Sequence, residues 1–175
     1  RYVALKFLRR DDPDLVERFT REAQAQARID HDNVCPVYEV GEIEGHSYIA
    51  MQYVAGGSLK QITDLLSLRQ KVQIMQSAAD AIHAAHLAGL IHRDIKPGNI
   101  LVEHQLDEGW RPFVVDFGIA RDVDSHDLTV TGMVLGTPAF CAPEQVRGET
   151  SKLDWRTDVY GIGATLYWFV TGKSP

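Results

Sequence analysis

HRDIKPGN at residues 92–99, together with DFG at residues 116–118, decides the fold of this chain. The two stretches hold side chains suited to phosphoryl transfer, in which a carboxylate orients the attacking hydroxyl and oxygen ligands hold magnesium against nucleotide phosphates. Either stretch alone could occur by chance. Both in this order, with the second aspartate 22 residues after the first, predict this chemistry specifically.

Four residues of these motifs have predicted roles. Asp94 is interpreted as the catalytic base, or as the carboxylate that orients the hydroxyl, and Lys96 as the cation that neutralises the transferred phosphoryl group. Asn99 and Asp116 would provide hard oxygen ligands, which suit Mg²⁺ better than zinc or iron. A turn cap is the alternative for Asn99, and its position five residues after Asp94 favours the ligand.

A lysine in an apolar strand also requires an explanation. Lys6 lies within residues 2–8, which read as a strand, and an unpaired buried ammonium would be costly there. Glu22, on the helix predicted to follow, is the expected partner. The alternative is an exposed strand lysine whose stem runs past the sheet edge.

These residues resemble the motifs of eukaryotic-like serine/threonine protein kinases, in particular those of bacterial type. VALK at 3–6 resembles the lysine motif of the third strand, and GTP at 136–138 with APE at 142–144 resembles the end of the activation segment. DWRTDVYGIG at 154–163 resembles the start of the long buried helix that follows. The similarity covers nearly all 175 residues.

The resemblance implies an α+β, two-lobed protein kinase-like fold that is partial in this chain. Residues 1–55 would be a partial N-lobe with the hinge, and residues 56–175 a partial C-lobe that reaches through the long buried helix. In the family, a glycine-rich loop precedes the lysine strand and further helices follow the buried helix. The domain is therefore expected to be truncated at both ends, and Glu144 is expected to lack the arginine that pairs with it in the family.

The resemblance also implies further site residues. Lys6 and Glu22 would align the α- and β-phosphates of ATP, and the adenine ring would lie between Ala4 and Leu101. His92 would pack beneath Phe117 as a structural residue. The remaining implied residues are the gatekeeper Met51, the hinge residues Gln52 and Val54, the activation-loop phosphosites Thr129 and Thr131, and Thr137 in the acceptor groove.

The activity implied is transfer of the γ-phosphoryl group of ATP, with Mg²⁺, to Ser or Thr hydroxyls of a protein substrate; Lys96 favours these acceptors over Tyr by resemblance. One alternative is a pseudokinase or scaffold that is inactive for lack of the glycine-rich loop. A second is a related small-molecule phosphotransferase. Residues 136–144 count against the second, because in the family they shape a groove for a peptide.

Composition narrows the other classes of function. With 45% hydrophobic and 24% charged residues, the chain has the composition of a globular domain. Its net charge of -6 and scattered Lys and Arg argue against a nucleic-acid partner. Cys35 and Cys141 lie far apart, and no apolar stretch is long enough to span a bilayer. A reduced, cytoplasmic setting is expected for the domain, although a parent protein could be anchored in a membrane.

The periodicity of the sequence predicts the order of its elements. On the first helix, an apolar stripe would hold Phe19, Ala23 and Ala27, with the polar Gln26 where the family packs an apolar or small residue. Gly56 and Gly57 form the candidate hinge between the lobes. The predicted strands are 2–8, 37–43, 47–54, 100–102 and 113–115. The predicted helices are 13 to about 29, a short one after Ser58, 69–88, and one that begins at Asp154. The inner face of the helix at 69–88 would hold Val72, Met75, Ala79, Ile82 and His86.

Overall fold

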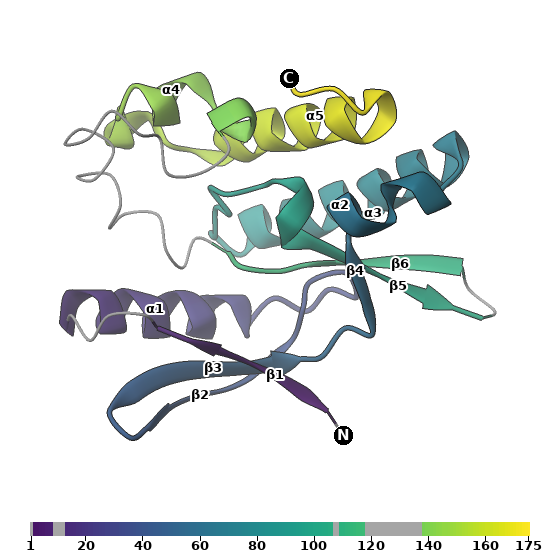
Figure 1. The fold of residues 1–175 in the computed structure, drawn as a ribbon. Helices are drawn as coiled ribbons and strands as arrows, with labels where there is room; N and C mark the ends of the chain where they lie inside the picture. The colour runs from purple at the N-terminus through teal and green to yellow at the C-terminus, as the bar shows by residue number, and fades with distance from the viewer. Residues whose placement is uncertain (1, 9–12, 107–108, 118–137) are drawn as a thin grey trace.

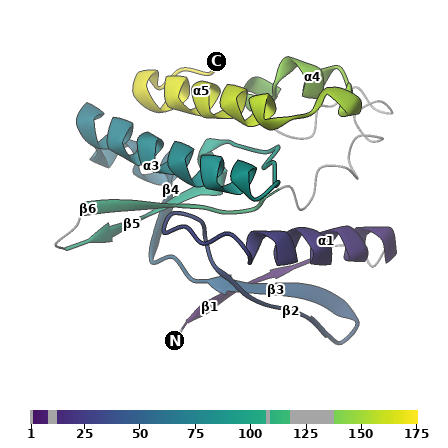
Figure 2. The same cartoon turned by 180° about the vertical axis from the view of Figure 1, so that it is seen from behind.

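A computed structural model describes residues 2–8, 13–106, 109–117 and 138–175. Its two three-stranded sheets have the strand orders β1-β3-β2 and β4-β5-β6. Helix α1 lies against the first sheet, the second sheet and α3 occupy the middle, and α4 and α5 lie on the far side from the first sheet (Figure 1). The view from behind shows the same layers (Figure 2). The described residues therefore form the mixed α+β arrangement that the sequence predicted.

The first sheet is built from β1 (Val3–Phe7), β2 (Val37–Ile43) and β3 (His46–Gln52). The β2–β3 hairpin turns through Glu44 and Gly45, whose φ angles of 51° and 82° are both positive, as a tight two-residue hairpin turn requires. The two strands predicted at 37–43 and 47–54 are therefore confirmed, with the second shifted by one or two residues at its ends. Among the described residues, strand β1 pairs with β3 alone, and this register sets Lys6 beside Ile49.

Helix α1 (Pro13–Gln26) begins at a proline, which is well suited to the first helical turn. Phe19 and Ala23 are buried as expected, but the helix ends at Gln26 and Ala27 is exposed. The third buried position belongs to Gln26, whose Nε2 donates to the carbonyl oxygen of Cys35 at 2.8 Å. A buried amide is tolerated here because it satisfies a buried carbonyl.

The second sheet contains β4 (Gly56–Ser58), β5 (Ile100–Gln105) and β6 (Gly109–Val114). The expected hinge glycines lie in β4, and their role as a hinge between lobes stays a prediction. Gly56 pairs with Glu103, and a Cβ atom on Gly56 would collide with the backbone carbonyl of Val102. Close approach of two backbones explains this glycine. The division of the chain at residue 56 stays a prediction.

Helices cover the second sheet. Ser67 is the N-cap of the long helix α3 (Leu68–Leu87), and its hydroxyl accepts from the N–H of Gln70. The prediction of which residues face inward was partly wrong, because Val72 is half-exposed. Small alanines, each one position before a predicted inward residue, are buried and allow close packing. The buried residues of α3 are Ile74, Met75, Ala78, Ala81, Ile82 and Ala85.

Three further helices are described, namely α2 (Leu59–Ile62), α4 (Pro143–Val146) and α5 (Trp155–Thr171). Short 3-10 turns lie at Thr63–Leu65, Pro97–Asn99, Pro138–Phe140 and Thr150–Lys152.

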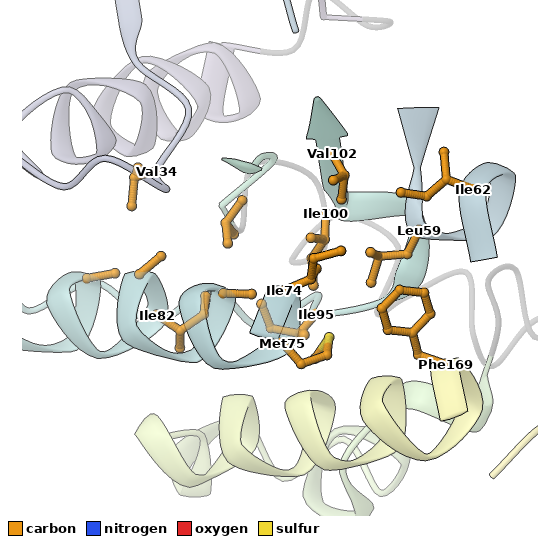
Figure 3. Packing of buried hydrophobic residues seen from close by; sticks show 14 of the residues in the cluster. Val34, Leu59, Ile62, Ile74, Met75, Ile82, Ile95, Ile100, Val102 and Phe169 are labelled. Atoms are coloured by element: carbon orange, nitrogen blue, oxygen red, sulfur yellow. The ribbon is translucent and has the colours of Figure 1, made fainter. Parts of the chain in front are cut away.

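The core has two clusters of buried hydrophobic side chains. The larger lies between α3, the second sheet and α5, where Ile74, Ile100 and Phe169 converge (Figure 3). The smaller lies between α1, the first sheet and the end of β6. Val34 pairs with Val114 in an isolated bridge, so the segment before β2 connects the two clusters.

We predict that Gln26→Met lowers the melting temperature. Methionine keeps the length of the side chain but leaves the buried Cys35 carbonyl without its donor, which costs about 1–3 kcal/mol. Gln24→Met on the exposed face of the same helix is the matched control. Thermal unfolding followed by circular dichroism measures both variants. Equal melting temperatures for the two would contradict a structural role for the Gln26 amide.

The two cysteines should differ in reactivity. Burial raises the pKa of the Cys35 thiol to about 11, so that at pH 8 it is protonated and shielded, whereas Cys141 is only half-buried. Iodoacetamide at pH 8 should therefore modify Cys141 before Cys35 in the folded protein, and both after denaturation. Mass spectrometry of the peptides gives the order, and rapid native labelling of Cys35 would be the contrary result.

Candidate active site

The β5–β6 hairpin brings the two sequence motifs together. Its antiparallel register sets Ile100 opposite Val114, so the residues just outside this pair, Asn99 and Val115, lie side by side. The N–H of Val115 donates to the carbonyl oxygen of Asn99 at 3.0 Å. Asp116 follows directly, with a φ of 62°. The end of the first motif and the start of the second therefore meet at one edge of the second sheet.

Asp94 lies in a compact hydrogen-bonded group with Lys96 and Asn99. Its Oδ2 accepts from Lys96 Nζ at 2.7 Å and from Asn99 Nδ2 at 2.9 Å. The same Nδ2 also donates to the Asp94 carbonyl oxygen at 2.8 Å. Three of the predicted catalytic residues are thus adjacent, and a cation and an amide hold the carboxylate in place.

The two bonds made by Asn99 also define the direction of its amide. Because Nδ2 faces two oxygens of Asp94, Oδ1 must point the other way. Among the described residues, no protein donor contacts that Oδ1. Asn99 is 6% exposed, so a solvent-facing turn cap does not describe it. Its oxygen is available to a hard cation.

Lys6 reaches Asp116 across the space between the two sheets. Its Nζ lies 2.7 Å from Asp116 Oδ1, and the two side chains are 31% and 35% exposed. The strand lysine is therefore paired, which rules out the reading of an unpartnered edge lysine. Glu22 is half-buried on α1, and its pairing with Lys6 stays a prediction.

His92 is a structural residue, as expected. It is fully buried, its ring centroid lies 4.6 Å from that of Phe117, and burial lowers the pKa of its imidazole below the ordinary value. The ring faces the Val115 carbonyl through Nε2 at 2.9 Å and accepts from the Asp94 N–H through Nδ1 at 3.2 Å. These partners require a neutral ring with its proton on Nε2.

Sequence reasoning missed the residue that holds the start of the motif. Asp158 on α5 is 1% exposed and accepts from the backbone N–H groups of His92 and Arg93, each at 2.7 Å. His86 Nε2 lies 2.7 Å from the same carboxylate. An aspartate inside an apolar helix was the available signal, because a buried carboxylate without donors would be strongly destabilising.

The residues expected around the adenine ring also gather in one place. Ala4 pairs with Met51 across the β1–β3 register, and both pack in one cluster with Val54 and Leu101. The N–H of Gln52 donates to the Pro36 carbonyl at 2.9 Å, so the protein already uses it. Of the two backbone groups of Gln52, the carbonyl is therefore the one that remains for a hinge contact to a base.

The segment that precedes α4 is only partly described. Thr129, Thr131 and Thr137 lie outside the described residues. Glu144 on α4 was expected to lack the arginine that pairs with it in the family, and this stays a prediction. Its carboxylate is not left alone, because it accepts from the Thr157 hydroxyl at 2.7 Å.

Oxygen donors dominate the candidate metal position. In the parts of the chain that the structure describes, no group of three or more His, Cys, Asp or Glu side chains is arranged to bind a metal by itself. The carboxylate of Asp116 and the amide oxygen of Asn99 are hard ligands, which fit Mg²⁺.

None of the helices in the described parts of the chain is long and apolar enough to cross a bilayer.

Comparisons with known proteins show the family of the chain. The chain matches the protein kinase domain family over residues 1–175. It is 45% identical over 184 residues to the serine/threonine-protein kinase pkn3 of Myxococcus xanthus, a match that covers 99% of this chain and 33% of that protein. The chain thus spans about a third of the length of this curated relative.

Solved structures show the same likeness. The crystal structure of the Mycobacterium tuberculosis PknI kinase domain matches with a TM-score of 0.77 and 30% identity, covering 100% of this chain and 64% of that chain. A structure of Rad53 in complex with AMP-PNP matches with a TM-score of 0.75 and 26% identity, covering 100% of this chain and 42% of that one. Since the family match extends along its whole length, the chain belongs to the protein kinase domain family.

Proposed function

We propose that this chain is part of the catalytic domain of a serine/threonine protein kinase, which transfers the γ-phosphoryl group of ATP to Ser or Thr hydroxyls of a protein substrate. The observation that carries the proposal is the group formed by Asp94, Lys96 and Asn99, next to the Lys6–Asp116 pair. Phosphoryl transfer depends on positioning and on charge stabilisation, and these five side chains can provide both.

Asp94 and Lys96 act on the transferred group. The Asp94 carboxylate accepts a hydrogen bond from the acceptor hydroxyl, directs its oxygen toward the phosphorus and takes its proton. Lys96 lies 2.7 Å from that carboxylate, so its ammonium can stabilise negative charge on the phosphoryl group during transfer. Asn99 holds Asp94 from the side through two hydrogen bonds.

Lys6, Asp116 and Asn99 would hold the nucleotide phosphates. Asp116 and the Oδ1 of Asn99 are the residues that would bind Mg²⁺, which supplies positive charge to the phosphates when bound. Lys6, with Glu22 as its proposed second partner, would contact the α- and β-phosphates. Its pairing with Asp116 supports this role, because the ammonium lies beside a proposed Mg²⁺ ligand. The adenine ring would lie between Ala4 and Leu101.

The two rival functions have less support. A pseudokinase or scaffold would not need the Asp94 carboxylate to be held by a lysine and an asparagine. A small-molecule phosphotransferase is disfavoured because the curated relative is named a serine/threonine-protein kinase. We therefore propose a protein substrate and no nucleic-acid partner. The net charge of -6 supports the absence of a nucleic-acid partner, and two free cysteines support a reduced, cytoplasmic position for the domain.

Asp94→Asn in the full-length protein should abolish most turnover while leaving ATP binding intact. The amide keeps the size of the side chain but cannot accept the hydroxyl proton, and a general base contributes about 10²- to 10⁴-fold in rate. Phosphorylation of myelin basic protein and binding of a fluorescent ATP analogue measure the two effects. Asp80→Asn, exposed on α3, is the matched control. Equal rates for wild type and Asp94→Asn would remove Asp94 from the mechanism.

Thr129 and Thr131 are proposed as autophosphorylation sites that control this activity. Each phosphate adds about -1.5 to -2 charges and three acceptor oxygens, which Arg93 beside the catalytic aspartate could bind. Incubation of the full-length protein with ATP and Mg²⁺, followed by mass spectrometry, should find both threonines modified. The double variant Thr129→Ala/Thr131→Ala should be slower; unmodified threonines together with an undiminished variant would refute the proposal. Thr137 is proposed to shape the acceptor groove instead.

A further inference from the structure

Gln145 occupies the third position of the short helix α4 and makes two hydrogen bonds in opposite directions. Its Oε1 accepts from the N–H of Ala142 at 3.0 Å, which caps the start of the helix. Its Nε2 donates to the backbone carbonyl of Arg93 at 2.7 Å. One side chain therefore joins α4 to the residue directly before Asp94.

Two other helices provide an internal comparison. Gln61 and Gln70 hold the same third position in α2 and α3, and each accepts from the N–H of its capping serine, at 2.8 Å and 2.9 Å. Glutamate caps a helix in this way as well as glutamine does. Within the described parts of the chain, neither of these two glutamines donates to a distant backbone carbonyl. Capping alone therefore does not explain the second bond of Gln145.

The bond to Arg93 acts on a peptide unit that is already held on its other edge. The carbonyl of Arg93 and the N–H of Asp94 belong to one planar group. The N–H faces His92 Nδ1 at 3.2 Å, and the carbonyl faces Gln145 Nε2. The peptide that carries Asp94 is thus fixed from both sides.

This peptide follows a residue in an unfavourable backbone conformation. Arg93 has a φ of 63°, in the left-handed region that costs roughly 1–2 kcal/mol for a residue other than glycine. Its own N–H is held by Asp158 Oδ1 at 2.7 Å. With Asp158 at one end and Gln145 at the other, the backbone around Arg93 is kept in a conformation that it would not adopt alone.

We propose that Gln145 is a positioning residue of the phosphoryl transfer reaction, which sets the direction of the Asp94 carboxylate by holding the Arg93–Asp94 peptide. The residue does not touch the substrate. It connects the catalytic aspartate to α4, and α4 is itself bound to α5 through Glu144 and Thr157. This inference rests on the proposed kinase activity, because it assigns Gln145 a role in that reaction.

Gln145→Glu isolates the relevant bond in the full-length protein. The carboxylate can still cap α4, but it has no donor for the Arg93 carbonyl. Gln145→Met removes both bonds without adding charge, and Gln70→Glu makes the same change at a capping glutamine away from the site. Both Gln145 variants should reduce kcat for myelin basic protein by about 10- to 100-fold, with unchanged affinity for a fluorescent ATP analogue. Gln145→Glu, which keeps the helix cap, should also keep the wild-type melting temperature, whereas Gln145→Met should lower it modestly. Gln70→Glu should match wild type.

A double-mutant cycle with Asp94→Asn separates positioning from a general structural role. If Gln145 acts through Asp94, Gln145→Glu should cause no further loss of kcat in the Asp94→Asn background. Additive losses, wild-type kcat in Gln145→Met, or loss of ATP binding together with a lowered melting temperature in both Gln145 variants would each overturn the inference. A wild-type protein that phosphorylates nothing would instead refute the proposed function, so the two failures are distinguishable.

Discussion

The rest of the site depends on the hydrogen bonds that the buried Asp158 carboxylate accepts from the backbone. Asp158 lies on α5, is 1% exposed, and accepts from the N–H groups of His92 and Arg93. Without these donors, a carboxylate at this depth would be strongly destabilising, so α5 and the loop after α3 must come together for either to fold. The same contact holds Arg93 in its left-handed conformation. Packing of α5 against the loop after α3 therefore also holds the backbone directly before Asp94.

The second constraint is the β5–β6 hairpin. Its register brings Asn99 beside Val115, so that Asp116 follows at the edge where Asp94 is held. Each carboxylate of the site is then paired with a lysine, Asp94 with Lys96 and Asp116 with Lys6, both at 2.7 Å. In the proposed function these two ammonium groups would face phosphate charge. The positive charge is then in place before a nucleotide binds, as preorganised catalysis requires.

The two sheets are joined by backbone contacts rather than by charge alone. The N–H of Cys35 donates to the Val114 carbonyl, and the Cys35 carbonyl accepts from Gln26. Helix α1 is thereby connected to the strand that leads to Asp116. The polar Gln26, which departs from the apolar pattern of its helix, is what makes this connection. A residue that conflicts with local periodicity has a tertiary reason.

The sequence by itself predicted most of the order of elements and singled out Asp94, Lys96, Asn99 and Asp116, because motif spacing and hydrophobic periodicity are local properties. The resemblance to a known family implied the structural role of His92. Only the tertiary structure decided which distant side chains hold these residues. Asp158 reaches Arg93 across 65 positions and Gln145 reaches it across 52. Such partners depend on how helices α4 and α5 pack against the catalytic loop, and the pattern of residues within any one segment does not specify that packing.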